Sequence, residues 1–209
     1  MEMPVGFRAD TFSCTKGRLP TSASILVFRP TYLDRTWAGK DLLFSRWGTW
    51  DPEDARVARN GWVENSGHEG NFVGVRAIYL WTPGEYKCEL APVDVDHHRT
   101  WYEFKATSKQ RNQTVSAGCL RFPSANIETG GGSWTEVYSG ASSERDVPFT
   151  EMRVSVVANG GGIRPIRCDT TYNSNFQSSD AFIERGQLVL RSGAEVQRLH
   201  SPGQFTIDA

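Results

Sequence analysis

Short runs of apolar residues, many of them alternating with polar ones, recur along most of the chain. Runs of this kind, rich in β-branched and aromatic residues, predict β-strands. We expect strands at 24–28, 41–47, 72–81, 85–91, 100–106, 114–122, 133–139, 151–158, 163–172 and 187–191. No helical pattern separates most of them, which excludes repeated βαβ units and favours an all-β, antiparallel β-sandwich. About ten strands in one domain, 1–209, favour a jelly-roll-like arrangement over a seven-stranded immunoglobulin sandwich.

One stretch, residues 51–61, departs from this pattern and predicts a short helix of at most about three turns. Asp51 suits the N-cap and Pro52 the first helical position. Asn60-Gly61 would end the helix. The stretch GWVENSGHEGNF, residues 61–72, is then expected to be a loop that leads into the strand at 72–81.

The strands at 72–81 and 85–91 are expected to pair as a hairpin. The Thr82-Pro83-Gly84 link favours a turn, because proline fixes φ and glycine accepts a positive φ. In the second strand one face should meet the core and the other solvent. The core face carries Tyr86, Cys88 and Leu90, and the solvent face carries Lys87 and Glu89. Residues after about 192 lack a periodic pattern and are expected to cover a sheet edge.

Composition narrows the class of protein. The chain has 209 residues, 38% of them hydrophobic and 22% charged, which is typical of a soluble globular protein. The net charge of −1 gives no basic surplus for nucleic acid, and no apolar run is long enough for insertion into a membrane. Seven tryptophans exceed the needs of a core of this size and favour exposed rings that stack on sugars.

The cysteines and the first residues bear on the compartment. Cys14, Cys88, Cys119 and Cys168 form no CxxC or cysteine–histidine cluster, so a structural zinc site is not expected. Two disulfides and four buried thiols are both compatible with their spacing. The start MEMPVGFRAD lacks the pattern of a signal peptide. We expect a cytoplasmic protein if the sequence is the native full length, and an extracellular one if a signal has been removed.

Three motifs in order, FSRWGTW, GHEGNF and YLWTPGEYKCEL, resemble domain-of-unknown-function family 3472 over roughly residues 40–140. The matching positions are Phe44, Ser45, Trp47, Glu69, Gly70, Tyr79, Trp81, Gly84, Tyr86, Trp101, Tyr102, Glu136 and Tyr138. The resemblance implies a secreted β-sandwich found beside carbohydrate-active or carbohydrate-binding modules, and it implies no established reaction. The chain departs from the family in lacking a signal peptide.

The stretch 61–72 holds the first candidates for chemistry. Glu64, Glu69 and His68 bring two carboxylates and an imidazole together in the sequence, and such groups perform acid–base work on glycosidic bonds. The alternative is a polar turn made by residues 65–67 with solvated carboxylates.

The strand at 133–139 holds a second set. Alternation places Trp134, Glu136 and Tyr138 on one face, where the rings would stack on a sugar and the carboxylate would accept its hydroxyl protons. The alternative is a core face on which Glu136 pairs with a cation such as Arg121 or Arg153.

A third, weaker cluster is the run at 94–98. Asp94 and Asp96 are candidate ligands for a structural calcium ion, and a polar hairpin tip is the alternative. No other cofactor is expected. Among the tryptophans, we expect Trp47 and Trp81 in the core and Trp50 and Trp62 partly exposed.

Three functions follow from these patterns. The first is glycan binding through Trp50, Trp62, His68, Glu69, Trp134, Glu136 and Tyr138. The second is a polysaccharide hydrolase or lyase that uses Glu64, Glu69 or Glu136 as acid or base with His68 assisting. The third is a structural or assembly domain without a small ligand.

Overall fold

The computed structural model describes residues 6–9, 23–33, 36–67, 70–123, 133–136, 149–154, 156–158, 161–163, 167–170 and 177–206. Side-chain environments are described for 40–65, 70–123, 149–154 and 177–202.

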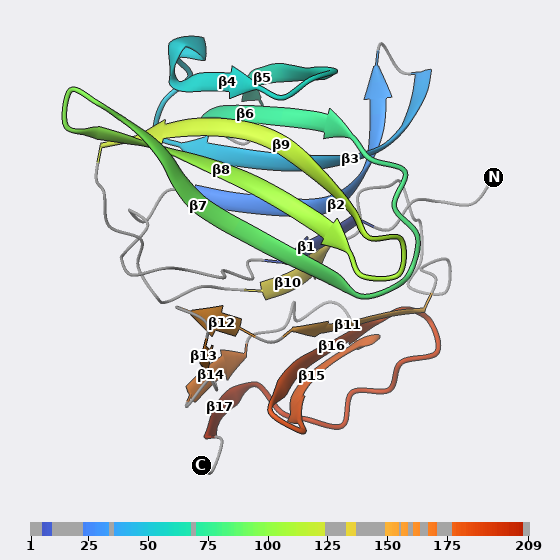
Figure 1. The fold of residues 1–209 in the computed structure, drawn as a ribbon. Coiled ribbons are helices and arrows are strands. Elements are labelled where there is room, and N and C mark those ends of the chain that lie inside the picture. Colours follow the sequence, from blue (N-terminus) through green and yellow to red (C-terminus); the bar gives the residue numbers. More distant parts are fainter. Residues whose placement is uncertain are drawn as a thin grey trace.

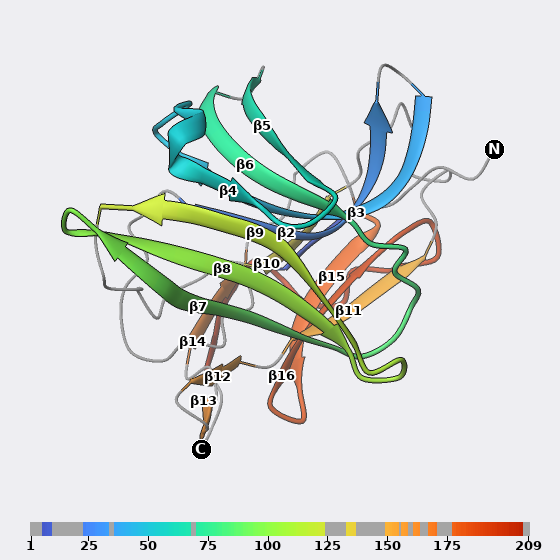
Figure 2. The same ribbon diagram turned by 45° about the horizontal axis from the view of Figure 1, so that its top comes forward.

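Two antiparallel sheets form the main body (Figure 1). The first has six strands in the order β10-β1-β2-β3-β6-β5, with bounds β1 Gly6–Ala9, β2 Ala23–Leu33, β3 Thr36–Trp47, β5 Gly61–Gly67, β6 Gly70–Ile78 and β10 Ser133–Glu136. The second has four strands in the order β4-β9-β8-β7, with bounds β4 Ala55–Val57, β7 Tyr86–Asp96, β8 Arg99–Ser108 and β9 Gln113–Phe122. Figure 2 shows the four-stranded sheet lying across the larger one. The predicted all-β, antiparallel, sandwich-like fold is confirmed.

The later part of the chain adds smaller sheets, drawn in orange and red in Figure 1. Strands β11 (Thr150–Val154), β16 (Gln187–Ser192) and β15 (Ser179–Glu184) form a three-stranded sheet in that order. Two two-stranded ladders pair β12 (Val156–Ala158) with β13 (Gly161–Ile163) and β14 (Arg167–Thr170) with β17 (Gly203–Thr206). Met152 of β11 packs against the main core.

The core lies between the two large sheets, because alternate residues of their strands point inward. Leu42, Phe44, Val73 and Val75 come from β3 and β6, and Tyr102, Phe104, Leu120 and Phe122 from β8 and β9. The Phe44 ring lies 6.0 Å from Phe122 and 6.1 Å from Phe104, centroid to centroid. Full burial of each such side chain stabilises the fold by roughly 1.5–3 kcal/mol.

The predicted helix at 51–61 is wrong beyond its first turn. Only a 3-10 turn, η1 (Pro52–Asp54), forms. Its start agrees with the prediction, since Asp51 Oδ1 accepts from the Glu53 amide at 3.0 Å and proline follows the cap. The next residues pair with β9 as β4, because tertiary contacts override a weak local helix preference.

The stretch GWVENSGHEGNF is not a loop between a helix and a strand. Residues 61–67 form β5, which pairs with β6 along its length. Asn60 turns the chain into β5 with φ of 62°. At Gly61 a Cβ would lie 2.5 Å from the carbonyl oxygen of Arg76, so glycine allows the two backbones to approach. The periodicity here was that of a strand, and the glycines concealed it.

The predicted hairpin through Thr82-Pro83-Gly84 is also wrong. Strand β6 pairs with β3 on one side and β5 on the other, so both its edges are occupied and the chain crosses to the other sheet. Lys40 fixes the crossover, donating from Nζ to the Trp81 carbonyl at 3.0 Å and lying 4.0 Å from the centre of that ring.

The predicted faces of the next strand, β7, are confirmed. Leu90 is buried and Cys88 packs against the core, while Lys87 pairs with Glu89 at 2.6 Å on the solvent side.

The segment that follows β16 returns to β15 and contacts it through side chains, and the covering of a sheet edge expected for residues beyond 192 stays a prediction. Arg198 Nε donates to the Ser179 carbonyl at 3.1 Å, and the His200 amide donates to Asp180 Oδ1 at 3.1 Å. In the described part of the chain, no helix is long and apolar enough to cross a membrane.

Candidate functional site

The outward face of β3, β6 and β5 combines aromatic and charged side chains. Because Leu42, Phe44 and Val75 point into the core, their strand neighbours point to the opposite face. Cross-strand pairing there sets Leu43, Arg76 and Trp62 in one row and Ser45, Gly74 and Glu64 in the next. This face is buried on β3 and β6, where Leu43 is 2%, Ser45 3% and Arg76 5% exposed, and it becomes partly exposed on β5, at the end of the strand order.

Three charged side chains form a chain of ion pairs across this face. Arg76 Nη1 donates to Asp41 Oδ2 at 2.7 Å, and Arg76 Nε pairs with the Glu64 carboxylate. Side-chain exposure rises from 0% at Asp41 through 6% at Arg76 to 34% at Glu64. The chain therefore runs from a buried anion to an anion at the surface.

Electrostatics keep the guanidinium of Arg76 charged. Burial alone lowers the pKa of Arg76, and the neighbouring charges of Asp41 and Glu64 outweigh this, so that its pKa is raised above the ordinary value.

One atom of this cluster lacks a partner. Asp41 Oδ1 is buried and accepts no hydrogen bond from the described residues. Within the described part of the chain, Glu64 has Arg76 as its one polar partner, and its other oxygen lies at the partly exposed end of the cluster. Unused acceptors of this kind recur where a polar ligand or an ordered water binds.

Aromatic rings surround the exposed end of the cluster. Trp62 lies two residues before Glu64 on the same face of β5 and is half-buried. Trp50 is 60% exposed, and its carbonyl accepts from Asn65 Nδ2 of β5 at 3.2 Å. The partial exposure predicted for Trp50 and Trp62 is therefore confirmed. Trp47 does not lie in the main core but on the outward face, with its ring 5.4 Å from Phe72.

The second predicted site lies at the other edge of the same sheet. Trp134 and Glu136 belong to β10, and β1, β2, β3 and β6 separate this strand from β5. Five inter-strand spacings amount to about 24 Å along the sheet. The two predicted sites therefore lie on opposite edges of the sheet and do not form one continuous binding surface.

Several predicted residues lie outside the described part of the chain. They are His68, Glu69 and Tyr138, together with the side chains of Trp134 and Glu136. The cations suggested for Glu136 are engaged elsewhere, Arg121 with Asp54 and Arg153 with Glu151.

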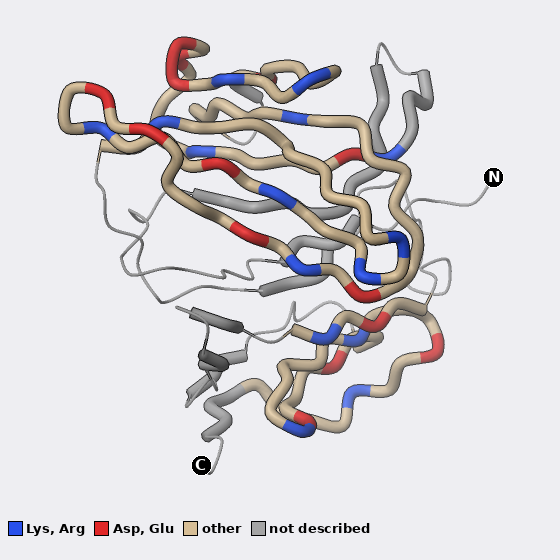
Figure 3. Tube along the Cα trace, viewed as in Figure 1, with Lys and Arg blue, Asp and Glu red and all other residues tan. Residues whose placement is uncertain are grey.

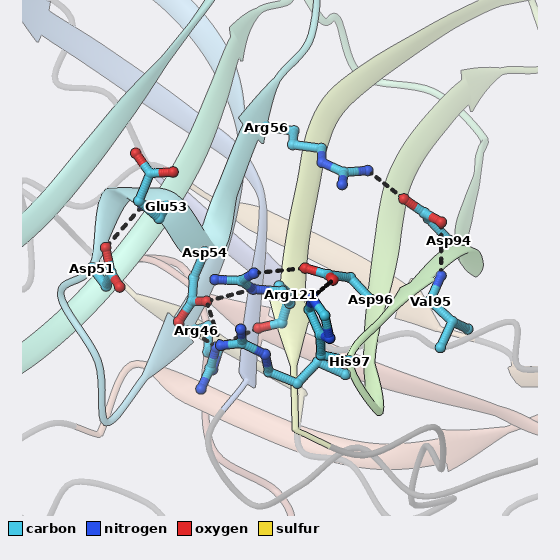
Figure 4. A network of polar contacts seen from close by, with 11 residues as sticks. Arg46, Asp51, Glu53, Asp54, Arg56, Asp94, Val95, Asp96, His97 and Arg121 are labelled. Atoms are coloured by element: carbon cyan, nitrogen blue, oxygen red, sulfur yellow. Dashed lines mark hydrogen bonds and ion pairs between the residues drawn. The ribbon is translucent and has the colours of Figure 1, made fainter.

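The run at 94–98 is a polar hairpin tip. His97 and His98 form the turn between β7 and β8, with φ of 45° and 67°. Arg56 binds the Asp94 carboxylate at 2.8 Å and Arg121 binds Asp96 at 3.0 Å (Figure 4). No group of three or more His, Cys, Asp or Glu side chains among the described residues is placed to hold a metal ion.

Figure 4 also shows the largest polar network of this end of the sandwich, centred on Asp54. Asp54 is 5% exposed and accepts from Arg46 Nη1 and Arg121 Nε, each at 2.8 Å. Arg121 and Arg56 also lie over Trp101, which is 3% exposed although it faces away from the core. Because every buried carboxylate here meets arginines, we interpret this network as structural.

Along the described strands, positive and negative side chains are interspersed (Figure 3). The described surface therefore agrees with the mixed charge expected from the sequence.

One pair escaped the sequence reasoning altogether. Asp180 of β15 accepts from the His200 backbone amide at 3.1 Å, and its Oδ2 lies 2.9 Å from His200 Nδ1. The imidazole stacks on Phe182 at 4.9 Å between ring centroids. Burial would raise the pKa of Asp180, and the hydrogen bonds from His200 outweigh it and lower that pKa. The two residues stand far apart in the sequence and follow no spacing rule, so no local signal points to them.

A scan against protein-family models and a search of the curated proteins each found no match for this chain. Its functional interpretation therefore rests on its own residues and their geometry.

Proposed function

We propose that the protein binds a glycan on the partly exposed face of β5. Trp62 provides the stacking surface, because the flat face of an indole matches the apolar face of a pyranose ring. Glu64 accepts hydrogen bonds from sugar hydroxyls. The observation that carries the proposal is that Glu64, beside the half-buried Trp62, is held at the surface by Arg76, itself held by the fully buried Asp41.

Preorganisation is what makes this arrangement suited to binding. An isolated surface glutamate loses rotamer freedom worth about 1.5–2 kcal/mol when a ligand immobilises it. Glu64 is already paired with a buried guanidinium, so much of this entropy is lost on folding rather than on binding. A buried ion pair by itself is weak evidence for a contribution to stability. In this proposal the pair formed by Asp41 and Arg76 has another role, because it holds the ligand-binding carboxylate of Glu64 in place.

Two further features support the same face. Trp50 is the most exposed tryptophan among the described side chains and is tied to β5 through Asn65, so it extends the aromatic surface. The resemblance to domain-of-unknown-function family 3472 supports an association with carbohydrate and with secretion, and both remain part of the proposal.

The hydrolase or lyase alternative is less well supported by this cluster. Cleavage of a glycosidic bond needs two carboxyl groups that both reach it. Here Asp41 and Glu64 both pair with Arg76. Asp41 is also fully buried and does not reach a substrate in this arrangement.

Calorimetric titration with a panel of soluble oligosaccharides tests the proposal. We expect at least one to bind, and Trp62→Ala to weaken it by about tenfold or more, because loss of one stacking ring removes about 1–2 kcal/mol. Phe149→Ala is the control, since Phe149 is a 54% exposed aromatic in the three-stranded sheet region.

No heat with any oligosaccharide, or equal affinity in Trp62→Ala with its fold intact by circular dichroism, would overturn glycan binding at this face. Reducing-end assays on the same mixtures report on the enzyme alternative, which gains support if product forms.

A further inference from the structure

We infer that this site selects neutral or amino-bearing sugars and rejects glycans that carry carboxylates or sulfates. The inference rests on the proposed glycan site and names its ligand class. It follows from the charges of the ion-pair cluster formed by Asp41, Arg76 and Glu64.

The cluster carries an excess of negative charge. Two carboxylates face one guanidinium, so the sum for these three groups is −1. Of the cations on β3, Arg46 is paired with its own anion, Asp54, and Lys40 Nζ contacts the carbonyl and the ring of Trp81 rather than this cluster. A ligand anion placed beside Glu64 therefore meets repulsion in a partly desolvated setting.

Arg76 is a poor partner for a ligand anion. Its Nη1 is bonded to Asp41 and its Nε is paired with Glu64, and its side chain is only 6% exposed. A ligand carboxylate that paired with these two nitrogens would have to displace Asp41 or Glu64. Asp41 is 0% exposed and would be left as a buried charge without its partner, which is strongly unfavourable. Displaced Glu64 would remain close to the incoming anion.

Hydrogen-bond donors, by contrast, match what the cluster offers. Glu64, whose side chain is 34% exposed, presents a carboxylate oxygen beyond its contact with Arg76. Sugar hydroxyls donate to carboxylates, and an ammonium group both donates and carries the opposite charge. Glu64 is the group that touches the ligand, and Asp41 acts as a positioning residue through Arg76.

The test compares oligosaccharides of equal length and different charge by calorimetry on the full chain: neutral cello-, xylo- and manno-oligosaccharides, a glucosamine oligomer and an oligogalacturonate. We expect the oligogalacturonate to bind at least about tenfold more weakly than the best neutral or amino ligand, which is about 1.4 kcal/mol. We also expect any preference for glucosamine over its N-acetylated form to shrink in molar salt, where the Debye length falls to about 3 Å.

Glu64→Gln removes one charge and keeps the shape. It should lower the ratio of glucosamine to neutral affinity and raise the relative affinity for oligogalacturonate. Glu89→Gln is the matched control, because Glu89 is also ion-paired and its side chain is 39% exposed against 34% for Glu64. It should leave both ratios unchanged.

The outcomes separate the inference from the function on which it rests. Oligogalacturonate that binds as tightly as the neutral ligands overturns the selectivity and leaves glycan binding standing. Selectivity that survives Glu64→Gln also overturns the assignment to this cluster. The absence of binding by every oligosaccharide overturns the proposed function and the inference together.

Discussion

Cys88 illustrates how burial controls the chemistry of a single residue. Its side chain packs against the core from β7, and Cys119 lies on β9. Both are free thiols, so neither takes part in a disulfide, whereas the side chains of Cys14 and Cys168 lie outside the described residues. Burial raises the pKa of the Cys88 thiol to about 12, because an apolar environment disfavours the thiolate.

We therefore expect Cys88 to make the fold sensitive to alkali. In the unfolded chain the thiol ionises near its ordinary pKa, while the folded protein keeps the proton until about pH 12. The stabilisation is fully present below the unfolded pKa and is lost as pH rises toward the folded one, by about 1.4 kcal/mol per pH unit.

Urea unfolding at increasing pH measures this loss. Cys88→Val, which removes the titrating group and keeps an apolar side chain, should flatten the alkaline slope relative to the wild type. Equal slopes in the two proteins would show that other groups cause the sensitivity.

Sequence reasoning at this scale succeeds where the rule is local. Alternation predicts the faces of Leu90 and Lys87, and a position beside the expected short helix predicts the partial exposure of Trp50. It fails for the ion-pair cluster, because Arg76 contacts Glu64 and Asp41 only when three strands pair. The register of that pairing cannot be deduced from the sequence of any single strand.

The segment 193–202 behaves as a strap along β15. Asp180 anchors it through two hydrogen bonds from His200, and Arg198 adds another to the Ser179 carbonyl. These contacts hold the strap against β15, an edge strand of its three-stranded sheet.

Asp180→Asn should loosen the strap. The pKa of Asp180 is lowered in the folded protein, so its contribution is present above the unfolded value of about 3.9 and is lost as pH falls through the folded pKa. At neutral pH we expect loss of about 1–3 kcal/mol of local stability, seen as faster amide hydrogen exchange at Val196 and His200.

Glu195→Gln serves as the control in the same strap, because Glu195 is exposed and the change should leave these exchange rates as they are. If Asp180→Asn also leaves them unchanged, Asp180 does not hold the strap.

At the scale of secondary-structure elements, the wrong predictions from the sequence share one cause. The predicted helix and the predicted hairpin were both drawn from local turn chemistry, which held at the Asp51 cap but did not produce a hairpin at Pro83. What decided the outcome was competition from partners distant in sequence: β9 captured residues 55–57, and β3 and β5 occupied both edges of β6. Short strands such as β1 and β17 were missed because four residues carry too little periodicity.

For the whole molecule, Asp54 joins the two large sheets at one end. It binds Arg46 of the six-stranded sheet and Arg121 of the four-stranded sheet, and Arg121 continues to Asp96 at the hairpin tip. The strand periodicity of the sequence predicted two packed sheets. No local sequence pattern indicated which charged residues would form ion pairs between them.

Asp54→Asn should therefore destabilise the whole sandwich. The change leaves the largely buried guanidinium of Arg46, 15% exposed, without its anion and removes one of the two anions of Arg121, which is 11% exposed. Loss of one partner of a buried pair costs about 3–5 kcal/mol. The midpoint of urea unfolding should fall accordingly.

Asp51→Asn, which changes an exposed cap on the same 3-10 turn, should cost less than about 1 kcal/mol, since asparagine also caps well. Equal effects of the two substitutions would mean that Asp54 acts only through the turn and not between the sheets.

Because β5 is at the end of its sheet, the residues of the proposed site differ in how freely they can be substituted during evolution. Trp62 and Glu64 stand on an edge strand, where a new side chain disturbs one neighbouring strand. Arg76 and Asp41 stand on β6 and β3, each flanked by two strands. Among descendants of this sequence, ligand preference can drift through substitutions on the edge while the anchoring pair stays in place.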